Sequence, residues 1–107
     1  MAKKAKTGFV HTVFFWLKKK ENAKHHAALH AGLKKLSKIL EIKIAYIGTP
    51  AATNREVIDS SYDFSITFIF ENSADQEVYQ NHPDHHKFIA KCSHLWSKVQ
   101  VYDAVSC

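Results

Sequence analysis

The chain has 107 residues, a length typical of one domain that buries roughly 65% of its extended surface when it folds. Its hydrophobic content of 46% and charged content of 23% are ordinary for a globular protein, and three glycines and two prolines exclude long flexible linkers. The formal net charge of +5 comes almost entirely from lysine, since Arg55 is the only arginine. Such a charge indicates a solvated surface with one basic end, or at most a weak patch for anions or nucleic acid.

Residues 1–7 form a basic N-terminal tail, and we expect the folded domain to cover residues 8–107. The apolar run behind the tail contains His11 and lacks a small-residue cleavage site, which argues against a secretory signal peptide. No apolar run approaches the ~20 residues of a membrane span, so no membrane partner is expected. Cys92 and Cys107 do not make a disulfide framework, and we therefore expect a cytoplasmic protein with reduced thiols.

Residues 8–17, GFVHTVFFWL, are rich in β-branched and aromatic residues, which predicts a strand. A strand with one face in water should alternate between apolar and polar residues. This strand does not alternate, because Phe15 lies on one face while Phe14 and Trp16 lie on the other. We therefore expect protein to cover both of its faces.

The next elements follow from apolar periodicity. Leucines recur at spacings of three and four over residues 21–40, which predicts a helix. Strands are predicted over residues 41–48 and 60–71, with a loop of small and polar residues at 49–60 between them. Ser73 is then expected to cap a short second helix, with a glutamine three residues later.

A third helix is predicted from Pro83, which suits a first helical turn and disfavours helical geometry at His82. The last strand is predicted over residues 98–105. The inward stripe of the third helix is expected to contain His85, Phe88, Cys92, Leu95 and Trp96.

The order β-α-β-β-α-β predicts an α+β fold of the ferredoxin-like type, a four-stranded antiparallel sheet with helices on one face. That arrangement leaves the second apolar face of the first strand uncovered. The simplest cover is a second copy, packed sheet against sheet about a two-fold axis as a dimeric α/β barrel. We therefore expect a homodimer through the sheet face.

Residues 79–88, YQNHPDHHKF, place three histidines within five residues, close to a tyrosine. His85 shares a helical face with Phe88, so it should point toward the sheet, where it could act as a general base while Tyr79 donates to a carbonyl oxygen. His11 lies on an apolar strand face and needs a polar partner, for which Tyr79 or His85 is available. The structural alternative for each histidine is a bond to a backbone group inside a filled core.

A metal site and an RNA site are the other interpretations. His82 and His85 have a spacing that ligands can adopt, but no second cluster completes a ligand set, so no metal and no cofactor are expected. The same order of elements occurs in RNA-recognition modules, which carry a glycine and a basic residue among the aromatics of the third strand. The segment YDFSITFIF has neither, and no nucleic-acid partner is expected.

Four segments, FVHTVFFWLK, SSYDFSITFIFEN, VYQNHPDHHKF and LWSKVQVYD, resemble the stress-responsive dimeric α/β-barrel (Dabb) family. The resemblance covers roughly residues 8–105. It implies a ferredoxin-like subunit that dimerises through its sheet. One plant branch of the family forms olivetolic acid by cofactor-free aldol closure of a linear polyketide. Its acid–base tyrosine and histidine match Tyr79 and His85, and two other histidines of that branch match His11 and His82.

The chain departs from that branch at Phe64, where the cyclase has a pocket histidine, and near Gly32, where it has a pocket tyrosine. Three functions therefore stay open: a cofactor-free enzyme of the lyase type that removes a proton beside a carbonyl, a module that binds a small apolar or aromatic molecule, and a structural stress protein with a filled core. The candidate catalytic residues are Tyr79 and His85. The other predicted pocket residues are His11, Val13, Phe15, Phe64, Ile66, Phe68, His82, Phe88 and Trp96.

Overall fold

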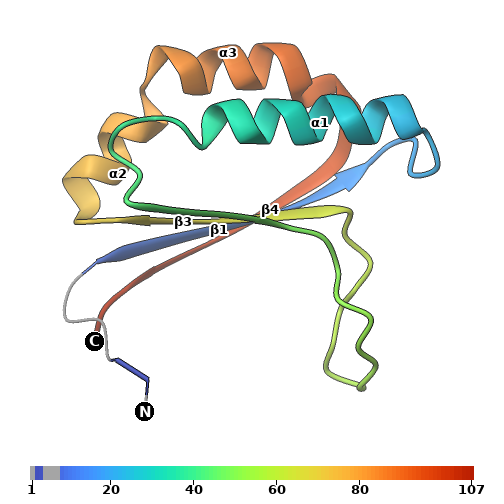
Figure 1. Ribbon diagram of the computed structural model, residues 1–107, viewed down its shortest axis with the longest axis horizontal. Coiled ribbons are helices and arrows are strands. Elements are labelled where there is room, and N and C mark those ends of the chain that lie inside the picture. Colours follow the sequence, from blue (N-terminus) through green and yellow to red (C-terminus); the bar gives the residue numbers. More distant parts are fainter. Residues whose placement is uncertain (1, 4–7) are drawn as a thin grey trace.

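The computed structural model describes residues 2–3 and 8–107, so most of the predicted basic tail lies outside the described residues. In chain order the elements are β1 (Phe9–Leu17), α1 (Ala23–Leu36), β2 (Ile44–Gly48), β3 (Phe64–Phe70), α2 (Ser73–Gln80), α3 (Pro83–Cys92), the 3₁₀ turn η1 (Ser93–Leu95) and β4 (Trp96–Val105). The strands form one antiparallel sheet in the order β2-β3-β1-β4, and the helices cover one of its faces (Figure 1). The predicted ferredoxin-like α+β fold is confirmed.

Strand β1 is paired along both edges, with β3 on one side and β4 on the other. Its odd-numbered side chains face the helices, because successive residues of a strand point to opposite faces. His11 lies opposite Phe68 of β3 and Asp103 of β4, so these three side chains share the helix-covered face. The core between this face and the helices contains Val13, Phe15, Leu17, Leu29, Leu33, Leu36, Ile66, Phe68, Phe70, Tyr79, Phe88, Cys92 and Leu95.

The helices begin where a side chain accepts hydrogen bonds from free backbone N–H groups. The amide oxygen of Asn22 accepts from the backbone nitrogens of Lys24 and His25, at 3.0 and 3.1 Å, so α1 starts two residues later than predicted. The prediction that Ser73 caps α2 is wrong. Asn72 is the cap, and its side-chain oxygen accepts from the backbone nitrogen of Asp75 at 2.9 Å.

Several predicted boundaries are also too wide. Helix α1 ends at Leu36, so Leu40, which the periodicity includes in the helix, lies outside it and is 89% exposed. Strands β2 and β3 start at Ile44 and Phe64, three and four residues inside the predicted ranges. Strand β4, by contrast, starts at Trp96, two residues before its predicted range. Trp96 therefore belongs to the sheet and Leu95 to η1, so neither lies on α3 as predicted, although Trp96 still packs on Phe88.

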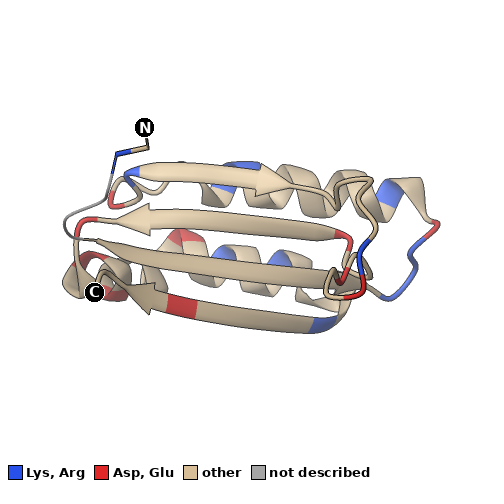
Figure 2. Cartoon of the chain, turned by 90° about the horizontal axis from the view of Figure 1, so that it is seen from below, with Lys and Arg blue, Asp and Glu red and all other residues tan. Residues whose placement is uncertain are grey.

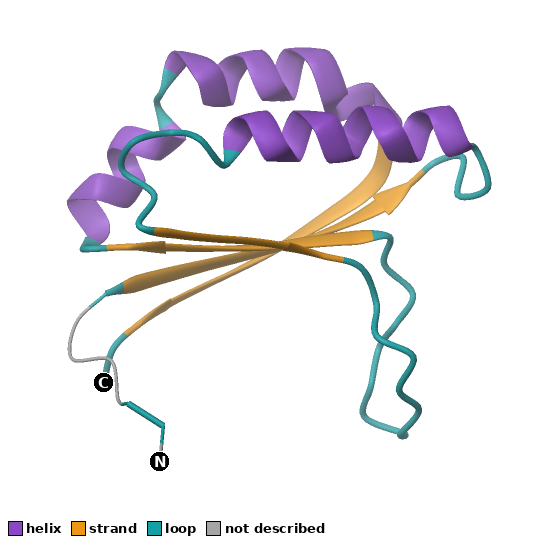
Figure 3. Ribbon diagram, viewed as in Figure 1, coloured by secondary structure: helices purple, strands orange, loops and turns teal. Residues whose placement is uncertain are grey.

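The other face of the sheet is open and largely apolar. Strands β1, β2 and β3 contain no charged residue, and Figure 2 shows their uniform colour on this face. The loop between β2 and β3 extends from the same side, away from the helices (Figure 3). No helix among the described residues is long and apolar enough to cross a membrane. Aromatic and aliphatic side chains on this face are Val10, Phe14, Trp16, Ile44, Tyr46, Tyr62, Ile69 and Tyr102.

Helices α1 and α3 approach each other closely at Gly32. A Cβ atom at this position would lie 2.6 Å from Sγ of Cys92 and 3.3 Å from Cδ1 of Phe88. Both neighbours are buried, so a Cβ atom at this position would force the side chain of Cys92 or the helix that carries it to shift. Glycine therefore sets the separation of the two helices, at a cost in helix propensity of about 1 kcal/mol relative to alanine.

We expect Gly32→Ala to destabilise the protein by about 1 kcal/mol, because overpacking of ~1–3 kcal/mol exceeds the gain in helix propensity. In a Cys92→Ala background, where Sγ is absent, the same substitution should be neutral or stabilising. Urea unfolding of the four variants measures both effects. An equal loss of stability in the two backgrounds would contradict a clash with Cys92.

Candidate functional site

A cavity of about 210 Å³ lies between α3 and the half of the sheet formed by β1 and β4. Its wall is mostly apolar. Ile89, Val99 and Val101 are 40%, 42% and 43% exposed, and they form its rim where the edge strand β4 extends beyond the helices. Eight of the eleven residues predicted for the site line the cavity: His11, Val13, Phe15, Ile66, Tyr79, His85, Phe88 and Trp96.

The other three predicted residues lie elsewhere. Phe64 shares the helix-facing side of the sheet but lies under α1, where its ring stacks on His30 at 5.6 Å between centroids. Phe68 is fully buried, because the ring of Tyr79 lies edge-on to it at 5.8 Å. His82 is the N-cap of α3: its Nδ1 accepts from the backbone nitrogen of Asp84 at 3.0 Å.

Three polar side chains from three different elements form a row along the cavity. Tyr79, at the end of α2, lies between His11 of β1 and His85 of α3. Its ring centroid is 5.6 Å from that of His11 and 5.0 Å from that of His85. The turn between α2 and α3 permits this arrangement, because it changes the chain direction between Tyr79 and His85.

His11 is hydrogen-bonded to an aspartate that the sequence analysis did not identify. Its Nδ1 donates to Oδ1 of Asp103 at 2.6 Å, so the prediction that Tyr79 or His85 supplies the partner is wrong. The imidazole is 6% exposed and the carboxylate 43%, which places a buried ring against a partly solvated charge at the rim. This bond fixes the orientation of the ring and leaves Nε2 without a contact to Asp103.

Tyr79 is held among aromatic rings and is 1% exposed. Phe70 lies 5.2 Å from its ring centroid, and Phe68 covers another side. Burial, followed by the negative charge of Asp103, raises the pKa of the Tyr79 phenol well above its ordinary value. The hydroxyl therefore stays protonated at physiological pH and can act as a hydrogen-bond donor.

His85 has the opposite shift. Burial is the largest cause that lowers its pKa below 6.5, and the positive charges that His86 and His11 would carry lower it further. Its Nε2 lies 3.4 Å from the side-chain amide of Gln80. Its Nδ1 is buried and has no hydrogen-bond partner among the described protein atoms. A neutral imidazole that lies beside a cavity and has an unsatisfied nitrogen is typical of a general base or of a residue that contacts a ligand.

Six lining residues were absent from the sequence prediction: Leu36, Gln80, Ile89, Val99, Val101 and Asp103. Strand alternation contained the signal for three of them. If Val99 and Val101 face the core, Asp103 must share that face. Among the described residues, no group of three metal-binding side chains is placed to hold an ion.

Comparison with known proteins agrees with this architecture. Residues 9–106 match the family model of the Stress Responsive A/B Barrel Domain, Dabb. No curated protein sequence matches the chain. A Dabb family protein of Mesorhizobium loti with a ferredoxin-like fold has a TM-score of 0.78 at 24% identity, over 95% of this chain and 99% of its own.

Two other solved structures share the fold. A dimeric ferredoxin-like protein of unknown function from Thermobifida fusca has a TM-score of 0.74 at 20% identity, over 94% of this chain and 92% of its own. The hydroxynitrile lyase of Passiflora edulis has a TM-score of 0.78 at 19% identity, over 94% of each chain. The family match extends over nearly the whole length of the folded domain, and the chain belongs to the Dabb family.

Proposed function

We propose that the cavity binds a small, largely apolar molecule with one carbonyl or hydroxyl group. The supporting observation is the row of His11, Tyr79 and His85 in an otherwise apolar wall. Apolar walls with a few polar groups are typical of small-molecule sites. The volume of about 210 Å³ is below the usual range of ~300–1,000 Å³ for drug-sized ligands, which favours a compound with a single ring.

The polar end of the ligand is expected to lie beside Tyr79. Its phenol is a neutral donor, and burial removes competition from bulk water. The apolar end would extend toward Phe15, Phe88 and Trp96, whose rings pack on one another at 5.1–6.2 Å between centroids. A cavity beside these groups favours this function over that of a structural protein with a filled core.

We expect acetophenone to bind about tenfold more tightly than ethylbenzene, which has a similar shape but no hydrogen-bond acceptor; one hydrogen bond of ~1–1.5 kcal/mol accounts for the difference. Tyr79→Phe should remove this preference and leave ethylbenzene binding unchanged. Chemical shifts of backbone amides along β4 and α3 report both titrations. Equal affinity of the two probes for the natural chain would contradict a polar contact in the cavity.

A second candidate function is cofactor-free proton transfer, which the lowered pKa of His85 favours. A base with a pKa below 6.5 is neutral at physiological pH and ready to accept a proton. The nearby phenol would donate a hydrogen bond to the oxygen that gains charge. The hydroxynitrile lyase from Passiflora edulis, which has the same fold, is a catalyst.

The simplest such step is removal of a proton from the carbon next to a ketone. The C–H electron pair forms the carbon–carbon double bond of an enolate, the proton moves to His85, and the π pair of the carbonyl moves onto its oxygen, which gains the negative charge beside Tyr79. Return of a proton from the imidazolium regenerates the ketone and the neutral base. In D₂O the imidazolium of His85 exchanges the abstracted proton for a deuteron from solvent before the return step, so the cycle incorporates deuterium into the ketone without any other net reaction.

We expect the protein to accelerate deuterium incorporation into the methyl group of acetophenone, measured by proton NMR after subtraction of the buffer rate. His85→Gln should reduce the enzymatic rate by about 10²-fold, the usual effect of a general base. The rate should fall as the pH is lowered, with a midpoint below the ordinary histidine value of 6.5, because the pKa of His85 is lowered and protonation removes the base. Binding of acetophenone without deuterium incorporation would contradict the proton-transfer function and support a binding module.

We also propose that the subunit forms a homodimer through the open face of the sheet. Phe14, Tyr62 and Tyr102 form an aromatic cluster on this face, and Tyr102 and Tyr46 are 61% and 64% exposed. Several proteins of the same fold, including that from Thermobifida fusca, are described as dimeric. Burial of about 800 Å² per subunit would be sufficient for a stable dimer.

We expect light scattering to give twice the chain mass of 12.2 kDa at micromolar concentration. Thr12→Arg should shift the protein to a monomer, because Thr12 lies at the centre of the open face, between Thr67 and Tyr102. Ala90→Arg, an exposed position on α3, is the matched control and should remain dimeric. A dimer that survives Thr12→Arg would contradict the sheet-to-sheet arrangement.

A further inference from the structure

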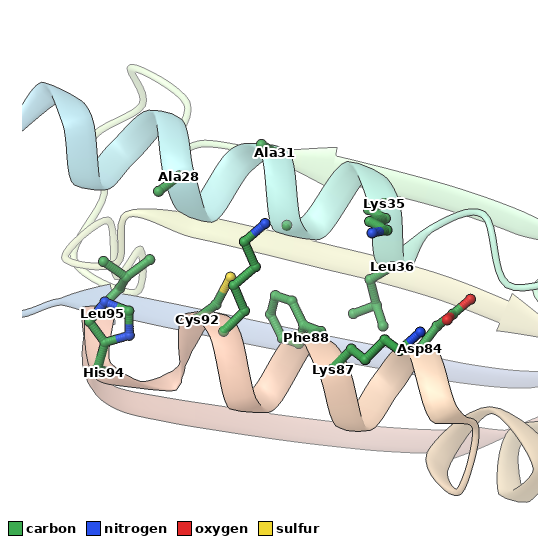
Figure 4. A pocket seen from close by; sticks show the side chains of 12 residues that line it. Ala28, Ala31, Lys35, Leu36, Asp84, Lys87, Phe88, Cys92, His94 and Leu95 are labelled. Carbon is green, nitrogen blue, oxygen red and sulfur yellow. The ribbon is translucent and has the colours of Figure 1, made fainter.

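A second hollow, larger than the cavity, lies on the outer surface between α1 and α3. This outer groove has a volume of about 510 Å³ and is separated from the cavity by Phe88 and Leu36, which line both. Figure 4 shows Phe88, Cys92 and Leu95 below a wall formed by Ala28 and Ala31 of α1. Small residues on α1 create the space, since larger side chains there would fill it.

The floor of the outer groove is apolar and recessed. Leu36, Phe88, Cys92 and Leu95 are each 7% exposed or less. A bilayer needs apolar side chains that protrude from the protein surface, and these four do not. A single extended hydrocarbon chain is narrow enough to lie along such a floor.

The rim of the outer groove is positively charged. Lys35 comes from α1, while Lys87 and Lys91 come from α3, and none of them forms an ion pair with a described residue. Asp84 is the only acidic residue in the lining, so the balance is three lysines against one aspartate. Lysine stems cover apolar surface while their ammonium groups stay at the rim, where an anion can meet them.

We propose that the outer groove binds a medium-chain fatty acid, with the chain on the apolar floor and the carboxylate among Lys35, Lys87 and Lys91. The lining residues of α1 extend from residue 28 to residue 36, about 12 Å at 1.5 Å per residue. An extended chain of roughly ten carbons has the same length, at ~1.2 Å per bond. This site is distinct from the cavity that holds the row of His11, Tyr79 and His85.

Decanoate is the probe, added to the full chain and followed by NMR shifts of backbone amides. We expect saturable one-to-one binding that weakens up to about fourfold for each methylene removed, as in octanoate. Decanol, which has no charge, should bind at least tenfold more weakly. Lys87→Gln with Lys91→Gln should cause a similar loss, while Lys34→Gln, on α1 but outside the groove, should cause none.

Two substitutions distinguish the outer groove from the cavity. Ala31→Leu should fill the groove and weaken decanoate at least tenfold, while Ala27→Leu, which is exposed on the same helix and does not line the groove, should not. Val101→Trp narrows the cavity alone and should leave decanoate binding unchanged. Loss of binding with Val101→Trp, no saturation, or binding only to anionic vesicles of phosphatidylglycerol would each overturn the proposal.

Discussion

The architecture depends on one constraint, which is that β1 is apolar on both faces and hydrogen-bonded along both edges. A strand in this position cannot contact water on either side without exposing large aromatic rings. The helices cover the face of Val13 and Phe15, whereas no helix covers the face of Phe14 and Trp16, whose side chains are only half-buried in the single chain. The same strand carries His11 into the covered layer, so the constraint that organises the fold also positions a polar group beneath the helices.

A polar group in that layer is costly unless it is paired. Asp103 offsets the desolvation cost of His11 with a hydrogen bond, because the register of β1 and β4 places the two residues directly opposite each other. Among the described residues, Tyr79 and His85 have no comparable partner, since Tyr79 is packed among rings and Nδ1 of His85 is unsatisfied. A buried polar atom without a partner requires an explanation, and the proposed ligand would supply one.

The sequence was sufficient for the fold because strand alternation and helical periodicity are local signals. It also identified most of the cavity wall, since His85 and Phe88 follow from helical spacing. The burial of individual side chains was not predictable. Phe68 lies on the same face of β3 as Ile66 but is covered by Tyr79, and the face of a strand alone does not reveal what lies above a side chain.

Two other differences have separate causes, one local and one long-range. His82 is removed from the cavity because a residue before proline favours extended geometry, and its ring then caps the next helix. Asp103 was overlooked because the sequence does not show how β1 and β4 pair. Its role depends on which residue of β1 lies opposite, and that register is a property of the ladder between distant segments.

Gly32 shows how one position can affect packing and binding together. Without a side chain there, α3 approaches α1 closely enough for Cys92 and Phe88 to contact the helix, and Phe88 then becomes a thin wall between the two hollows. A larger residue at Gly32 would push α3 outward and change both volumes at once. The departure from the cyclase branch near this position therefore alters the space around the site, while Tyr79 and His85 are retained. For the proposed ligand, the resemblance to the cyclase therefore indicates the polar end of the cavity but not the shape of the molecule that the cavity accepts.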